Sequence, residues 1–112
     1  MKTLFLCLFL IAAFAFIRPP QENYTVGEVL RKARQLDRDS STVRLTGYFT
    51  RKLSKGWYQF ADRTAEIKVY VDDKYLPSKP LDDRISMILY ASVEYEQNKP
   101  VTLKANKLIT EE

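Results

Sequence analysis

The side chains that most often carry out catalysis are scarce in this chain. Its 112 residues contain no histidine, which removes the commonest general base and the commonest transition-metal ligand. Cys7 is the only cysteine, so the chain can form neither an internal disulfide nor a zinc site built from several cysteines. No serine or threonine therefore has a histidine to activate it.

Two acidic pairs remain, Asp72-Asp73 and Asp82-Asp83. Neighbouring residues on a strand point to opposite faces, and aspartate is favoured in turns, so the pairs indicate turns rather than an acid–base site. A calcium or magnesium site at these pairs is the alternative, because hard cations take several oxygen ligands at once. We expect a protein that is not an enzyme, with no catalytic residue, no metal and no cofactor.

Aromatic and basic residues offer binding chemistry instead. In three segments, residues 42–49, 57–62 and 66–71, apolar side chains alternate with aromatic, polar or basic ones. If the apolar set points inward, the other set shares one outer surface. The candidate ligand-binding residues are Arg44, Tyr48, Trp57, Gln59, Lys68 and Tyr70 on the strands, with Lys55 and Lys99 in loops. Aromatic rings stack on bases and on the apolar faces of sugars, and the cations suit an anionic ligand. The alternative is that the rings are cross-strand pairs that only stabilise the sheet, and that the cations are simply solvated.

A helix and five strands must position these residues. Thr25 and Glu28 form a capping-box pattern at the start of a helix predicted over residues 24–36. Its apolar stripe is Val26, Val29, Leu30, Ala33 and Leu36.

The strands are predicted over residues 42–49, 57–62, 66–71, 84–95 and 100–109, the fourth with Ile85 and Met87 inward and the last with a bulge near Asn106-Lys107. A connection over residues 72–83 is expected to hold one helical turn. Five strands in so short a chain must close on themselves, which predicts a mainly β protein: a five-stranded OB-type barrel with an N-terminal helix. An SH3-like barrel is the rival topology.

The first residues are typical of an export signal. Lys2 precedes an apolar run over residues 4–17, which is too short to span a bilayer but fits a signal peptide. We therefore predict a signal peptide over residues 1–15, a linker over 16–23 and an OB-fold domain over 24–112, with cleavage after Ala15. The predicted location is the periplasm or another exported site, with no stable membrane span. If the leader is not cleaved, the domain is tethered to the membrane.

Several short stretches resemble the bacterial OB-fold (BOF) family, the YgiW/YdeI-type stress-tolerance proteins of the bacterial envelope. The matching pieces are Thr25-Val26, Val43-x-Leu45-x-Gly47, Tyr58-x-Phe60-x-Asp62, Ile67-x-Val69-x-Val71-Asp72 and Asp83. The resemblance implies an exported protein that helps cells survive stress by binding something, and it carries no catalytic residue to transfer.

Two functions follow from the sequence. The first is an exported binding module for an anionic or glycan-like envelope ligand or a protein partner. The second is a single-stranded nucleic-acid binder that uses the same face. Export argues against nucleic acid as a partner, because it is scarce in the periplasm. A scaffolding subunit that uses an exposed strand edge is a third reading. The sequence carries no signal for an oligomeric state.

Overall fold

A computed structural model describes residues 22–112 of the chain. The elements are β1 (Glu22–Asn23), α2 (Val26–Arg38), β2 (Thr42–Ser54), β3 (Trp57–Ala61), β4 (Glu66–Tyr70), the 3-10 helix η1 (Asp73–Tyr75), β5 (Met87–Glu94), β6 (Thr102–Ala105) and β7 (Thr110–Glu111). The predicted signal peptide lies outside the described residues. The last two residues of the predicted linker form β1, which pairs in parallel with β2. Within the described part of the chain, neither helix is long and apolar enough to cross a membrane.

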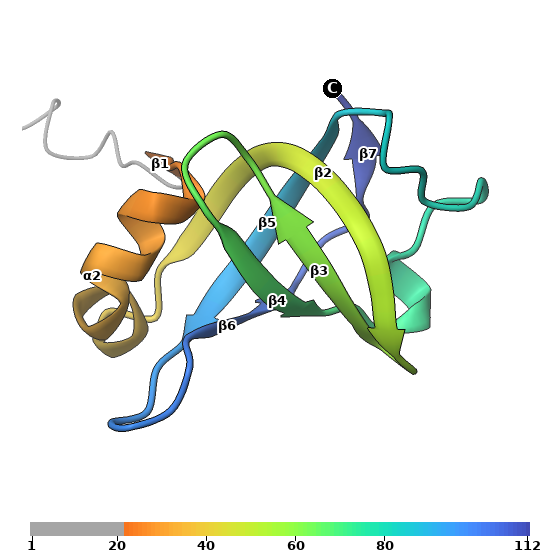
Figure 1. The fold of residues 1–112 in the computed structure, drawn as a ribbon. Helices are drawn as coiled ribbons and strands as arrows, with labels where there is room; N and C mark the ends of the chain where they lie inside the picture. The colour runs from red at the N-terminus through yellow and green to blue at the C-terminus, as the bar shows by residue number, and fades with distance from the viewer. Residues whose placement is uncertain (1–21) are drawn as a thin grey trace, which may run out of the picture.

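Five strands close into a barrel (Figure 1). The sheet runs in the order β2-β3-β4-β6-β5, and β5 pairs back onto the first half of β2. β4 and β6 are parallel, whereas the other pairs of barrel strands are antiparallel. This order confirms the predicted OB-type barrel with an N-terminal helix and rules out the SH3-like alternative.

Helix α2 lies against one end of the barrel (Figure 1). Thr25 is its N-cap, as predicted, and the helix runs from Val26 to Arg38 rather than over residues 24–36. The capping box is formed: the Thr25 hydroxyl accepts the Glu28 N–H, and the Glu28 carboxylate accepts the Thr25 N–H at 2.9 Å. That second bond lowers the pKa of Glu28 below its usual value. The stripe that faces the barrel is narrower than predicted, because Leu30 is 38% exposed. The residues of α2 that join the core are Val26, Val29, Ala33 and Leu36.

The turn after β3 holds the helix in place. One carboxylate oxygen of Asp62 accepts the Val26 N–H at 2.8 Å, and the Thr64 hydroxyl accepts the Gly27 N–H at 2.8 Å. The other Asp62 oxygen accepts the Thr64 N–H at 2.8 Å and the Thr64 hydroxyl at 2.6 Å. Partial burial alone would raise the pKa of Asp62, but the hydrogen bonds from Thr64, Val26 and Ala65 outweigh burial and lower that pKa.

Strand β2 is five residues longer than predicted and pairs with two neighbouring strands. Its first half pairs with β5 up to Gly47, and its second half pairs with β3 from Tyr48 to Ser54. Two register shifts, at 49–51 and 52–54, bend the strand between these partners. Gly47 sits where β2 crosses β3 closely, because a Cβ there would collide with the Ala61 carbonyl oxygen. Inside the barrel, the residues predicted to face inward on the first three strands are buried, with Phe60 the largest fully buried side chain.

Two of the predicted strands are wrong at their ends. β5 begins at Met87, because residues 82–85 form a turn in which Asp82 accepts the Arg84 N–H and the Ile85 N–H bonds to the Asp82 carbonyl. Ile85, predicted to face inward, is 38% exposed. The last strand breaks after Ala105 near the predicted bulge, and the chain then forms β7 against the start of β5. The predicted helical turn is present as η1.

Candidate ligand-binding face

The outer surface of β3, β4 and β6 gathers rings and cations into rows. Trp57 on β3 lies opposite Tyr70 on β4, and Tyr70 lies opposite Lys104 on β6. In the next row, Gln59 lies opposite Lys68. We call these five residues the aromatic–basic face. Lys68 and Lys104 are exposed, whereas the three others are partly buried.

The two rings of this face also support the sheet. The Trp57 and Tyr70 rings meet edge to face, with centroids 5.4 Å apart and planes at 64°. Tyr70 also lies over Gly56, which has φ +82°, and a Cβ there would approach the Tyr70 Cε1 to 2.6 Å. Glycine tolerates this positive φ, which a residue with a side chain rarely adopts. Because the rings are not coplanar, they do not form one flat platform.

Some polar groups of the face already bond to other residues of the protein, and others do not. The Gln59 amide donates to the Glu66 carboxylate at 2.9 Å. Lys68 and Lys104 make no ion pair with a described residue. Lys55 is exposed in the hairpin turn between β2 and β3. Two or three ammonium groups beside a partly exposed ring can bind an anionic group and stack against an apolar surface.

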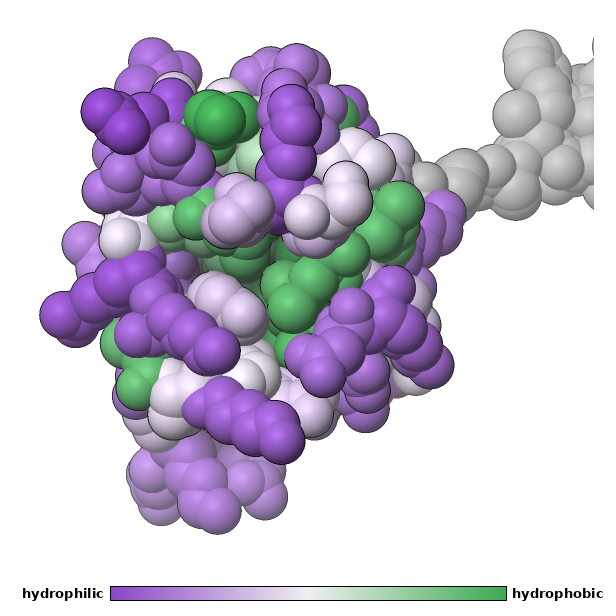
Figure 2. All heavy atoms as spheres, turned by 90° about the vertical axis from the view of Figure 1, so that its right-hand side faces the viewer, coloured by the Kyte–Doolittle hydropathy of each residue, from purple (hydrophilic) through white to green (hydrophobic). Residues whose placement is uncertain are grey.

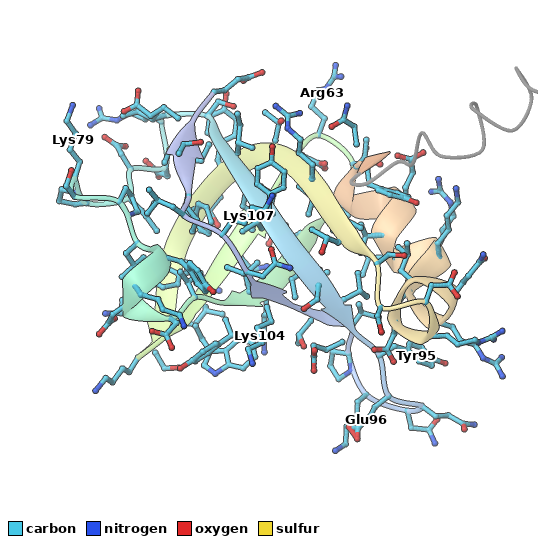
Figure 3. All side chains as sticks on the ribbon, turned by 180° about the vertical axis from the view of Figure 1, so that it is seen from behind. Arg63, Lys79, Tyr95, Glu96, Lys104 and Lys107 are labelled. Atoms are coloured by element: carbon cyan, nitrogen blue, oxygen red, sulfur yellow. The ribbon has the colours of Figure 1, made fainter. Side chains whose placement is uncertain are left out.

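Lys104 was not among the residues predicted from the sequence. The alternation of β6, with Leu103 and Ala105 buried, puts Lys104 outside. What places it beside Tyr70 is the parallel pairing of β4 and β6, which period-2 patterning does not reveal. In Figure 3, Lys104 lies at the lower side of the barrel, whereas Lys107 lies beside β5, with its ammonium group 4.7 Å from the centre of the Tyr90 ring.

Three predicted residues lie away from these rows. Arg44 lies opposite Tyr90 on β5, and its guanidinium donates to the Asn23 side chain at 3.0 Å. Lys99 is in the β5–β6 loop, where it forms an ion pair with Glu96 at 3.1 Å. Tyr48 is 39% exposed and lies opposite Ala61, at the far end of the face from Trp57.

The acidic pairs take part in local turns. Asp72 caps η1 by accepting the Lys74 N–H, and Asp82 accepts both the N–H and the side-chain Nε of Arg84. The bond from the Arg84 N–H lowers the pKa of Asp82. Among residues 22–112, no three potential metal-ligating side chains cluster together.

Strand order and the parallel β4–β6 pair together define an oligonucleotide/oligosaccharide-binding (OB) fold. Within that class, the family model for bacterial OB fold (BOF) proteins matches residues 20–109, and the chain belongs to this family. The structure is similar to that of the hypothetical protein YgiW from E. coli, with a TM-score of 0.63, 23% identity, and coverage of 74% of this chain and 86% of that one. It is also similar to the OB domain of a Methanosarcina mazei protein, with a TM-score of 0.53, 17% identity, and coverage of 85% and 84%. At these identities the likeness shows a shared fold. No curated protein matches the chain at a significant level.

Proposed function

We propose that this protein is an exported, non-enzymatic binding module of the bacterial envelope that takes an anionic or glycan-like ligand on the aromatic–basic face. The observation that supports this most is the row Trp57–Tyr70–Lys104, with Lys68 in the adjacent row. The rings, the amide and the ammonium groups of this face can stack on a ligand, hydrogen-bond to it and pair with its charges, which supports a binding role. The strand 2–3 surface of OB barrels, here β3 and β4, is where such folds take oligosaccharides and oligonucleotides.

The ligand chemistry follows from the geometry of the two rings. Because Trp57 and Tyr70 meet at 64°, only one ring at a time can lie flat on a ligand. The exposed ammonium groups of Lys68 and Lys104 then supply most of the contacts to the anionic groups of the ligand. This arrangement favours an anionic polysaccharide, which needs one stacking surface and several cations, over a strand of stacked bases, which uses successive rings.

The binding test uses the single tryptophan as its reporter, because Trp57 lies on the face. Dextran sulfate, uncharged dextran and an oligothymidylate are titrated into the protein at low and at physiological salt. We expect dextran sulfate to change the fluorescence, uncharged dextran to bind more weakly, and the affinity for dextran sulfate to fall as salt rises. Tighter binding of the oligothymidylate would favour the single-stranded nucleic-acid function instead.

A variant with both lysines of the face changed, Lys68→Gln with Lys104→Gln, locates the site. Two exposed charge contacts of about 0.2–1 kcal/mol each, about 0.4–2 kcal/mol together, correspond to a loss of affinity of about 2-fold to 30-fold. The control is Lys107→Gln, which removes one positive charge beside β5, half the charge change of the double variant. If the double variant and the control bind dextran sulfate as tightly as the parent, the ligand does not use this face.

Export is tested separately. The full-length chain is expressed in a Gram-negative host, the cells are fractionated, and the intact mass of the protein is measured. We expect a periplasmic species that starts at Phe16. A full-mass species in the membrane fraction would indicate a tethered domain, and a full-mass species in the cytoplasm would contradict export and the envelope role.

A further inference from the structure

A groove opens at the end of the barrel that α2 does not cover. Figure 2 shows it as a hollow with apolar side chains at its centre and hydrophilic ones around it. Its volume is about 1380 Å³, larger than the roughly 300–1,000 Å³ of a pocket for a small ligand. One wall is β2 over residues 49–52, the other is the segment over residues 76–85, and residues 108–111 close one side.

The floor of the groove is apolar, and so is part of its rim. Phe49, Tyr58 and Met87 line it from within the core. Two of the large hydrophobic residues that the described chain exposes are on this groove, Ile85 at 38% and Leu108 at 52%. Apolar side chains that gather beside a groove mark an interaction site more often than scattered ones do.

The wall formed by β2 also presents a strand edge. The pairing of β2 with β5 ends at Gly47 and Met87, because the chain before Met87 turns away. Beyond Gly47, the described residues pair with β2 on one edge only, the edge that β3 occupies. Residues 49–52 line the groove, so an incoming strand in the groove can pair with the other edge of β2.

The charged residues that line the groove indicate which side chains an incoming strand would carry. Arg51 and Lys52 on the β2 wall make no ion pair with a described residue. Arg51 lies opposite the outward Gln59, whereas Lys52 lies opposite Tyr58, with its ammonium group 5.9 Å from the centre of that ring. Across the groove, Asp82 is already bonded to Arg84, and Lys79 projects from the same segment (Figure 3). Two further carboxylates, Asp83 and Glu111, line the groove away from the β2 wall. Arg51 on the β2 wall therefore complements an acidic side chain, while the floor accepts apolar ones.

We propose that this groove binds an extended peptide segment of a partner protein, which adds a strand to the free edge of β2. Successive side chains of the added strand point to opposite faces, so apolar residues enter the groove on the face that carries Tyr58 and Lys52, and acidic residues lie beside Arg51 on the outer face. The unpaired strand edge selects a peptide over an acyl chain, which has no backbone groups to pair. This site is distinct from the aromatic–basic face and does not depend on the function proposed for that face.

The test uses a panel of octapeptides in which Val, Ile, Leu or Phe alternates with Glu, added to isotope-labelled protein up to about 1 mM. We expect at least one peptide to shift the amide resonances of residues 48–52 and to slow their hydrogen exchange. The same peptide methylated on alternate backbone nitrogens, and the version with Lys in place of Glu, should each bind at least tenfold more weakly. The proposal fails if no peptide binds, if the shifts fall elsewhere, or if the methylated peptide binds equally well.

Two variants with equal exposure separate the groove from the rest of the surface. Ile85→Glu places a charge on the groove, whereas Leu30→Glu places one on α2, and both parent residues are 38% exposed. We expect Ile85→Glu to weaken peptide binding at least tenfold and Leu30→Glu to leave it unchanged, with both proteins folded. Two other occupants would overturn the proposal. One is a second copy of the chain, in which case the free protein is a dimer and Ile85→Glu dissociates it. The other is an acyl chain, in which case a detergent shifts the amide resonances of residues 48–52 and no peptide does.

Discussion

Replacing Asp62 by alanine should remove the main polar link between helix α2 and the barrel. The Asp62 carboxylate accepts the Val26 N–H at 2.8 Å, and Val26 is fully buried, so water has little access to that N–H after the substitution. A hydrogen bond to a charged group contributes about 1.5–3 kcal/mol, and a capping acceptor at a helix start contributes about 0.5–2 kcal/mol. The donors of Thr64 are exposed and can turn to water, so they add little. We expect the free energy of unfolding to fall by about 2 kcal/mol.

Urea unfolding followed by tryptophan fluorescence measures this loss. With a slope of about 2 kcal/mol per molar urea, the midpoint should fall by about 1 M. Asp37→Ala is the matched control, because its exposed carboxylate makes no hydrogen bond or ion pair with a described residue. This control should move the midpoint by no more than about 0.25 M, which corresponds to about 0.5 kcal/mol.

The pH dependence of the same difference gives a second check. The folded state lowers the pKa of Asp62, so the folded protein holds the charged form more strongly than the unfolded chain does. This contribution is fully present above the unfolded pKa of about 3.9 and is lost as the pH falls through the lower folded pKa. The gap between parent and Asp62→Ala should therefore narrow below about pH 4. A gap under about 0.5 kcal/mol at pH 7, or one that stays constant into acid, would refute the reasoning.

Three core and turn substitutions should destabilise the barrel, and thermal unfolding followed by circular dichroism checks each. Gly47→Ala forces a Cβ against the backbone of β3 and should lower the free energy of unfolding by about 1–3 kcal/mol. Phe60→Ala leaves a cavity at a fully buried position and should lower it by about 3–5 kcal/mol, so a loss below about 1 kcal/mol would mean that the ring is not packed as described. Gly56→Ala combines a strained φ of +82° with a clash against Tyr70, and should both destabilise the protein by more than about 1 kcal/mol and change the fluorescence of Trp57. Unchanged Trp57 emission in that variant would show that the ring contact is not formed.

The local features of the fold were predictable because they depend on neighbouring residues. The capping box at Thr25 and Glu28 and the alternation of the first three strands both follow from spacing alone. Ile85 shows the limit of such patterns. An apolar residue in step with a strand looks like part of it, and the turn that places Ile85 outside depends on the hydrogen bonds of Asp82.

The candidate face was predictable only in part, because a barrel brings together strands that are distant in sequence. Alternation correctly put Trp57, Lys68 and Tyr70 on the outside, but it does not say which strand lies next to which. The parallel pairing of β4 with β6 adds Lys104 to the face. The pairing of β2 with β5 takes Arg44 to a different side of the barrel.

The way the barrel is closed explains why the chain carries two separate surfaces. An N-terminal helix fills one end with four buried side chains, whereas the link between β4 and β5 contains only the short η1 and leaves the other end open as a groove. The chain before Met87 turns away from β2, which frees the other edge of the second half of β2 beside the groove. The aromatic–basic face depends instead on β3, β4 and β6. Because different elements build the two surfaces, substitutions at Lys104 and at Ile85 should act independently. A variant with both substitutions should bind dextran sulfate as the Lys104 variant does, and the peptide as the Ile85 variant does.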